Sequence, residues 1–246
     1  MRKIVALLFI LIPASQSVLA ADWQVMQTVS IASPKFDMKQ ENTTSSRQAV
    51  NGSVLSRQVV DVIGQGDSLS SVTQKATFAA TSVTLTQSGS TNSTVQTVNL
   101  ASAPSIIQLE QTVEDFSSAK LTQNVTGSGN VQALNYAEAG GIISDATQAV
   151  TGVSVSLMKS ATTPAGNIQA VNYMKADRYS GVITQTLDLS GRLSVENGSS
   201  NRSDMRINSI NGDTTNADNI IQTVKIRGLE VDGNEFPTII LNHVGQ

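Results

Sequence analysis

The sequence has no cysteine, and its 246 residues include one histidine, one tryptophan and only 4% aromatic residues. Without thiols the chain can form no disulfide, no cysteine-ligated metal centre and no cysteine nucleophile. A site with several histidines is also excluded, because His243 stands alone. Charged residues make up 14% of the chain and the formal net charge is −3, so we expect no basic surface for nucleic acid. We therefore predict no metal, no cofactor and no nucleic-acid partner.

The first twenty residues have the features of an export signal. Arg2 and Lys3 provide a positive start, residues 4–12 are apolar, and small residues up to Ala20 offer a cleavage site. The apolar run is about half of the roughly 20 residues that a membrane-crossing helix needs. We expect residues 1–20 to be a signal peptide. The mature chain should then have no transmembrane segment, and should pass through a periplasm to the cell surface or the medium as a secreted protein.

A repeat of 37 residues runs through the rest of the chain. Each of five glutamines follows the previous one by 37 positions, as in 111 − 74 = 37 and 148 − 111 = 37: Gln74, Gln111, Gln148, Gln185 and Gln222. Apolar residues stand two positions before and two after each glutamine, as Val72 and Ala76 do around Gln74. This period of two places the glutamine and its apolar neighbours on one face of a β-strand, with threonines on the other face.

Two further segments keep nearly the same spacing. The sequence NVQALNY at residues 130–136 returns as NIQAVNY at residues 167–173, and VTLTQ at 83–87 resembles LTQNV at 121–125. Glycine-rich turns separate the segments, so each unit consists of about three short strands. We predict an all-β fold, a repetitive β-solenoid of stacked rungs that bury a continuous core. A β-sandwich is the alternative, although it does not require a constant period.

Stacking gives the buried amides their partners. Equivalent side chains in successive rungs lie about 4.8 Å apart, so each amide N–H can donate to the next amide oxygen. We predict one ladder from the five glutamines spaced by 37 residues, and a second from Gln132, Asn135, Gln169 and Asn172. The alternative places the glutamines on a solvated face with the threonines turned inward.

The ends of the chain depart from the repeat. We expect residues 21–37 to be an N-terminal edge strand or cap, and residues 38–224 to be the repeats, with degenerate copies at 38–74 and 186–222. Residues 196–219 lack the expected second segment, so we expect them to bulge outward. Residues 225–246 should form a C-terminal cap, because Pro237 can block further ladder hydrogen bonds.

The glutamine spacing, the Asn130 and Asn167 segments and the Gly127-Ser128-Gly129 turn together resemble the secreted functional amyloids of bacteria, of the curli and Fap types. The resemblance covers roughly residues 38–224 and implies a fibre or biofilm-matrix subunit, whether major, minor or nucleating. It also implies self-association and partner proteins for export or nucleation.

Other functions are compatible with the same pattern. The alternative is a monomeric adhesin or carbohydrate-binding solenoid, with Tyr136 and Tyr173 either as a sugar platform or as an aromatic pair that braces the sheet. A lyase on a β-helix would use carboxylates such as Asp145, Asp177 or Asp188. We expect no enzyme and no catalytic residue, because acidic residues in turns are more simply explained by solvation.

Overall fold

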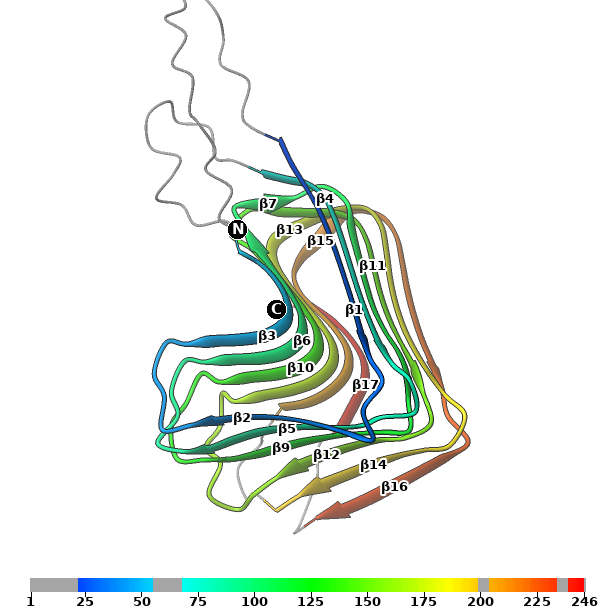
Figure 1. The fold of residues 1–246 in the computed structure, drawn as a ribbon. Helices are drawn as coiled ribbons and strands as arrows, with labels where there is room; N and C mark the ends of the chain where they lie inside the picture. Colours follow the sequence, from blue (N-terminus) through cyan, green and yellow to red (C-terminus); the bar gives the residue numbers. More distant parts are fainter. Residues whose placement is uncertain (1–21, 55–67, 199–203, 234–238, 246) are drawn as a thin grey trace, which may run out of the picture.

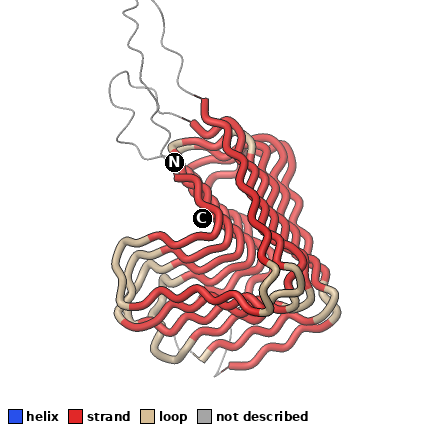
Figure 2. The backbone as a smooth tube through the Cα atoms, viewed as in Figure 1, coloured by secondary structure: helices blue, strands red, loops and turns tan. Residues whose placement is uncertain are grey.

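The computed structural model describes residues 22–54, 68–198, 204–233 and 239–245, and the proposed signal peptide lies outside them. Strands account for nearly all of these residues, which contain no helix, and short loops join the strands at the corners (Figure 2). Strands of successive layers run side by side through the whole molecule (Figure 1). The structure confirms the predicted all-β solenoid.

The chain passes along three faces in each of six layers, and on the first face of the third layer the strand is divided into β7 and β8. The first three layers consist of β1 (Asp22–Ile31), β2 (Lys35–Glu41), β3 (Arg47–Val54), β4 (Ser68–Phe78), β5 (Ser82–Gly89), β6 (Val95–Ala103), β7 (Ser105–Ile106), β8 (Leu109–Phe116), β9 (Ser118–Val125) and β10 (Val131–Ala139). The last three consist of β11 (Ile142–Gly152), β12 (Val155–Lys159), β13 (Ile168–Leu189), β14 (Arg192–Asn197), β15 (Asp204–Lys225), β16 (Gly228–Gly233) and β17 (Ile239–Gly245). Two long strands, β13 and β15, each end one layer and begin the next.

The strands form three faces, and every strand pair is parallel. The first face contains β1, β4, β7, β8, β11 and the C-terminal halves of β13 and β15. The second face is the six-stranded sheet β16-β14-β12-β9-β5-β2. The third face contains β3, β6, β10, the N-terminal halves of β13 and β15, and β17. The β-sandwich alternative is therefore wrong, because a sandwich is made of antiparallel sheets.

The spacing of 37 residues between paired glutamines is constant on the first face, whereas the spacing between paired residues on the second face varies. On the first face Gln111 pairs with Gln148, and Gln148 with Gln185, always 37 residues apart. On the second face Leu85 pairs with Leu121 at a distance of 36 residues, whereas Leu157 pairs with Val195 at 38. Turns of different length compensate one another, so the column of glutamines stays in register while the corners vary.

Two apolar cores lie inside the layers, one on each side of a polar band. The larger core contains Val83, Leu85 and Leu121 of the second face with Ala76 of the first. The smaller core contains Val72, Leu109, Ala146 and Ile183 of the first face with side chains from the end of the third. The two apolar residues that flank each glutamine thus enter different cores, as Val72 and Ala76 do. In the repeated apolar-x-Gln-x-apolar pattern, the first apolar residue thus lies in the smaller core, the glutamine in the polar band and the second apolar residue in the larger core.

The stack begins earlier than residue 38. β1 lies within residues 21–37 and pairs along its length with β4, at the edge of the sheet, and β2 crosses residue 38. Gln27 pairs with Gln74, and 74 − 27 = 47, so ten additional residues shift this first layer out of the 37-residue frame.

The outward bulge predicted for residues 196–219 is wrong for residues 204–219. These belong to β15, which pairs with β13 in constant register from Asp204 to Asn211, where Asn208 lies beside Asn172, and with three register shifts further along. Residues 225–246 supply β16 and β17, each of which pairs on one side only and ends the stack.

Candidate functional site: amide columns and open strand edges

The first-face glutamines form a continuous column through all six layers. Each Nε2 donates to Oε1 of the glutamine one layer nearer the N-terminal end, at 2.8 Å from Gln74 to Gln27, 2.7 Å from Gln111 to Gln74 and 2.7 Å from Gln148 to Gln111. The next two steps, from Gln185 to Gln148 and from Gln222 to Gln185, are 2.8 Å each. The four central glutamines are 0% exposed. The alternative that placed these residues on a solvated face is wrong.

The same amides connect the first face to the third. Nε2 of Gln111 also donates to the Tyr136 carbonyl at 3.0 Å, and Nε2 of Gln148 donates to the Tyr173 carbonyl at 3.2 Å. Both N–H bonds of each amide are therefore satisfied, which removes the penalty of about 1 to 3 kcal/mol for an unpaired buried group. The column holds successive layers together and also closes each layer across its interior.

An asparagine column on the third face runs beside the glutamines with the opposite polarity. It consists of Asn51, Asn99, Asn135, Asn172, Asn208 and Asn242. Each Nδ2 donates to Oδ1 of the next layer toward the C-terminal end, at 2.8 Å from Asn99 to Asn135 and 2.9 Å from Asn135 to Asn172. The second N–H bonds reach first-face carbonyls, such as that of Ala149 at 3.0 Å from Asn135.

The predicted second ladder is thus two separate columns, since Gln132 and Gln169 belong to a third one. Nε2 of Gln96 donates to Gln48 at 3.0 Å, Nε2 of Gln132 to Gln96 at 2.8 Å, and Nε2 of Gln169 to Gln132 at 2.8 Å. On the second face a fourth column joins Gln40, Gln87 and Gln123 with steps of 2.9 Å.

Sequence reasoning missed much of this arrangement. The fourth column was visible in the Thr-Gln pairs at residues 86–87 and 122–123, but their spacing of 36 residues falls outside the 37-residue frame. The first-layer members Gln27, Gln40, Gln48 and Asn51 are hidden by the longer step of 47 or 48 residues.

Both shorter glutamine columns stop before the last layers. Lys159 follows Gln123 in the register of the second face, and Met205 follows Gln169 on the third. Within the described residues, Oε1 of Gln123 and Oε1 of Gln169 are buried and accept no hydrogen bond. Only the first glutamine column and the asparagine column therefore continue to layer 6.

No protein-family model, curated protein or solved structure matches this chain. The function is therefore inferred from the chain's own geometry. Over the described ranges, no helix has the length and apolar character to span a membrane. The same residues contain no group of three or more histidine, cysteine, aspartate or glutamate side chains arranged to hold a metal ion.

A groove of about 500 Å³ lies along the third face, and Tyr136 and Tyr173 form part of its lining. Their rings stack on each other with centroids 5.5 Å apart and an interplanar angle of 25°. The residues are only 2% and 1% exposed, so neither ring face is open for a sugar. At the rim, the Glu138 carboxylate forms ion pairs with Arg47 and with Lys175, each at 3.4 Å. The tyrosines brace neighbouring layers, and the charged groups define the groove surface.

Burial of tyrosines predicts a loss of stability at high pH. Burial, with the nearby Glu138 carboxylate adding to it, raises the pKa of Tyr136 well above its usual value, and burial also raises the pKa of Tyr179. Because the unfolded phenols ionise near pH 10, their contribution is fully present below that pH and is lost as the pH rises above it. We expect the melting temperature to fall above about pH 10, and to fall less steeply in Tyr179→Phe, as measured by circular dichroism. An equal slope in the variant would contradict this assignment.

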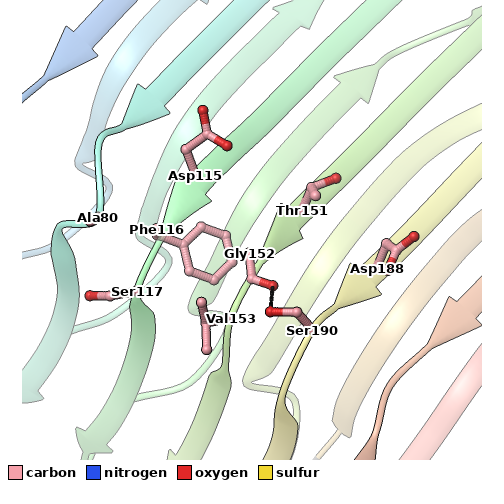
Figure 3. A pocket seen from close by; sticks show the side chains of 9 residues that line it. All are labelled: Ala80, Asp115, Phe116, Ser117, Thr151, Gly152, Val153, Asp188 and Ser190. Atoms are coloured by element: carbon pink, nitrogen blue, oxygen red, sulfur yellow. Dashed lines mark hydrogen bonds between the residues drawn. The ribbon is translucent and has the colours of Figure 1, made fainter.

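The carboxylates considered for a lyase lie apart. Asp188 lines a depression with Asp115 and Thr151, in which the Phe116 ring lies over Gly152 (Figure 3). Asp145 lines a second depression and accepts the Val182 backbone N–H at 3.0 Å, and Asp177 lines a third. Asp145, Asp177 and Asp188 thus line three different depressions.

The two ends of the stack are open strand edges with different exposure. In layer 6, inward-facing apolar side chains are strongly exposed, 50% for Leu229 and 43% for Val231, whereas their counterparts Leu193 and Val195 one layer below are 0% exposed. In layer 1 the equivalent Met38 is 9% exposed. Layer 6 therefore ends in apolar surface that a further layer would cover.

Proposed function

We propose that this chain is an exported structural protein that assembles end to end through its open strand edges, as a fibre or matrix subunit. The observation that carries the proposal is the exposed inner row of layer 6. Leu229 and Val231 are the last members of two columns of apolar side chains. The members of these columns in layers 2 to 5 are buried. Exposed edge strands with unpaired backbone groups and apolar side chains favour addition of another strand.

The buried amide columns support a structural role in the same way. A parallel stack with identical side chains in register gains a hydrogen bond at each added layer, and a slip of one layer leaves buried amides unpaired. Such a framework suits a protein whose task is to persist as a rigid element. The proposal of export depends on the signal-peptide features of residues 1–20. A secreted or surface location, and partner proteins for export or nucleation, are part of the same proposal.

A second candidate is a monomeric adhesin that binds carbohydrate. The groove beside Tyr136 favours it, because Arg47, Glu138 and Lys175 place charged donors and an acceptor along a concave surface. This candidate requires a stable monomer, so a measurement of the oligomeric state distinguishes it from the fibre proposal.

Electron microscopy of purified residues 21–246 tests assembly. We expect fibres whose thickness corresponds to one solenoid, with a meridional reflection near 4.7 to 4.8 Å in oriented samples, because the strands lie across the stacking direction. Discrete particles at high protein concentration, with a monomeric mass by sedimentation, would rule out the fibre proposal. A monomer that binds polysaccharide would favour the adhesin.

A further inference from the structure

We propose that copies join head to tail, with layer 6 of one copy on layer 1 of the next, in the register that continues the first glutamine column and the asparagine column. This inference rests on the assembly proposed above and specifies which surfaces meet.

The polarity of the asparagine column makes the two ends chemically complementary. Asn51 donates to Asn99 and to the Lys75 carbonyl, and its Oδ1 accepts no hydrogen bond within the described residues. At the other end, Asn242 accepts a hydrogen bond from Asn208 and, among the residues that the structure describes, donates to the Gln222 carbonyl alone, at 3.4 Å. A head-to-tail contact places the spare Asn242 N–H over Asn51 Oδ1 of the next copy. A head-to-head contact would place two Asn51 acceptors against each other.

The glutamine column agrees with this direction. Its amides donate toward layer 1, so the last member, Gln222, keeps an Oε1 that no donor within the described residues reaches. The head-to-tail register places this oxygen at the layer 1 end of the next copy, in the column that begins there with Gln27. Both columns thus continue in the same arrangement, although their hydrogen bonds run in opposite directions.

The apolar rows of the second face match in the same register. The column that ends at Leu229 begins at Phe36, and the column that ends at Val231 begins at Met38. Strand lengths agree as well, since β2 has 7 residues and β16 has 6. Joining the ends would cover Leu229 and Val231 with side chains that occupy the same columns.

Two amide columns are sufficient for such a contact. Within the chain the two shorter glutamine columns have ended before layer 6, so the last in-chain contact depends on the same two columns as the proposed junction. The junction therefore repeats a contact that the fold already contains.

A charged pair on the outer row makes the register testable. Lys39 begins the outer column that ends at Asp232, so these two side chains would lie opposite each other across the junction, about 4.8 Å apart along the stack. Opposite charges in this position attract, and like charges repel.

The experiment uses two single variants, Lys39→Asp and Asp232→Lys, at low ionic strength. Each variant alone places like charges at every junction, so we expect its fibre growth rate to fall roughly tenfold. An equimolar mixture should recover growth close to the wild-type rate, because every alternating junction then pairs one acid with one lysine. Ser156→Asp, on the outer row in mid-stack, is the control and should grow like wild type.

The outcomes separate the two proposals. If the wild-type chain forms no fibres, the assembly itself fails. If the wild-type chain grows but the mixture stays as slow as the single variants, copies assemble in another register or direction, and the head-to-tail inference is overturned. Circular dichroism of each monomer establishes that the variants fold before growth is compared.

Discussion

Replacement of Gln148 by Glu should destabilise the fold by about 3 to 5 kcal/mol at neutral pH. The new carboxylate oxygen would replace the Nε2 that donates to Gln111 Oε1 at 2.7 Å and to the Tyr173 carbonyl at 3.2 Å. A fully buried charge would then face two oxygen acceptors, and a buried charge left without a partner costs about 3 to 5 kcal/mol. Chemical denaturation followed by circular dichroism measures the loss as a lower midpoint.

The pH dependence of this variant identifies the cause. Burial raises the pKa of an introduced glutamate above its unfolded value of about 4.3. The penalty should therefore be present at neutral pH and shrink as the pH falls, because the protonated acid can donate a hydrogen bond again. Ala149→Glu, on the outward side of the same strand, is the matched control and should cost less than about 1 kcal/mol. Equal losses in the two variants would show that the column contributes nothing specific.

Replacement of Asn135 by Leu should cost about 2 to 6 kcal/mol through hydrogen bonds alone, since two buried side-chain groups lose their partners at roughly 1 to 3 kcal/mol each. These groups are one N–H of Asn99 and Oδ1 of Asn172, and the backbone carbonyls of Ala149 and Gln111 also lose a donor. Leucine has the same side-chain branching as asparagine but bulkier methyl groups, so overpacking at this buried position adds to the loss. The denaturation midpoint measures the effect.

The last member of the same column provides the comparison. Asn242 is exposed at the open edge, where water can replace its hydrogen bonds. Asn242→Leu should therefore change the stability of the monomer by less than about 1 kcal/mol. A similar loss of stability at Asn135 and Asn242 would mean that burial within the stack does not determine how much an amide side chain contributes to the free energy of unfolding. In the proposed fibre Asn242 lies inside the junction, so the same variant should slow growth.

Much of the architecture could be predicted from the sequence because one face repeats without a length change. Gln74 to Gln222 recur every 37 residues, and a period-two pattern around each of them specifies a strand with its glutamine inward. The first layer could not be recognised in this way. Gln27 pairs with Gln74 at a distance of 47 residues, so a search at a constant period passes over it.

The C-terminal layers were misjudged for a different reason. Residues 204–219 carry Met205 where earlier layers have glutamine, and their abundance of asparagine and aspartate is typical of loops. In the structure they remain a strand because β13 pairs with them in constant register from Asp204 to Asn211, with irregularities further along, and Asn208 continues the asparagine column. Backbone pairing with an existing layer outweighs local composition.

The absence of cysteine and the shortage of aromatic residues first excluded disulfides, metal centres and a large aromatic core. The sequence by itself determined the strand content, the inward glutamines and the need for stacking, because these follow from side-chain periodicity. Only the tertiary structure decided that the glutamines form three columns, that the six-membered asparagine column runs opposite to the first of them, and that these two columns separate two apolar cores. Those properties depend on which strands of a layer face each other, and turns of variable length set that arrangement without a fixed spacing along the chain.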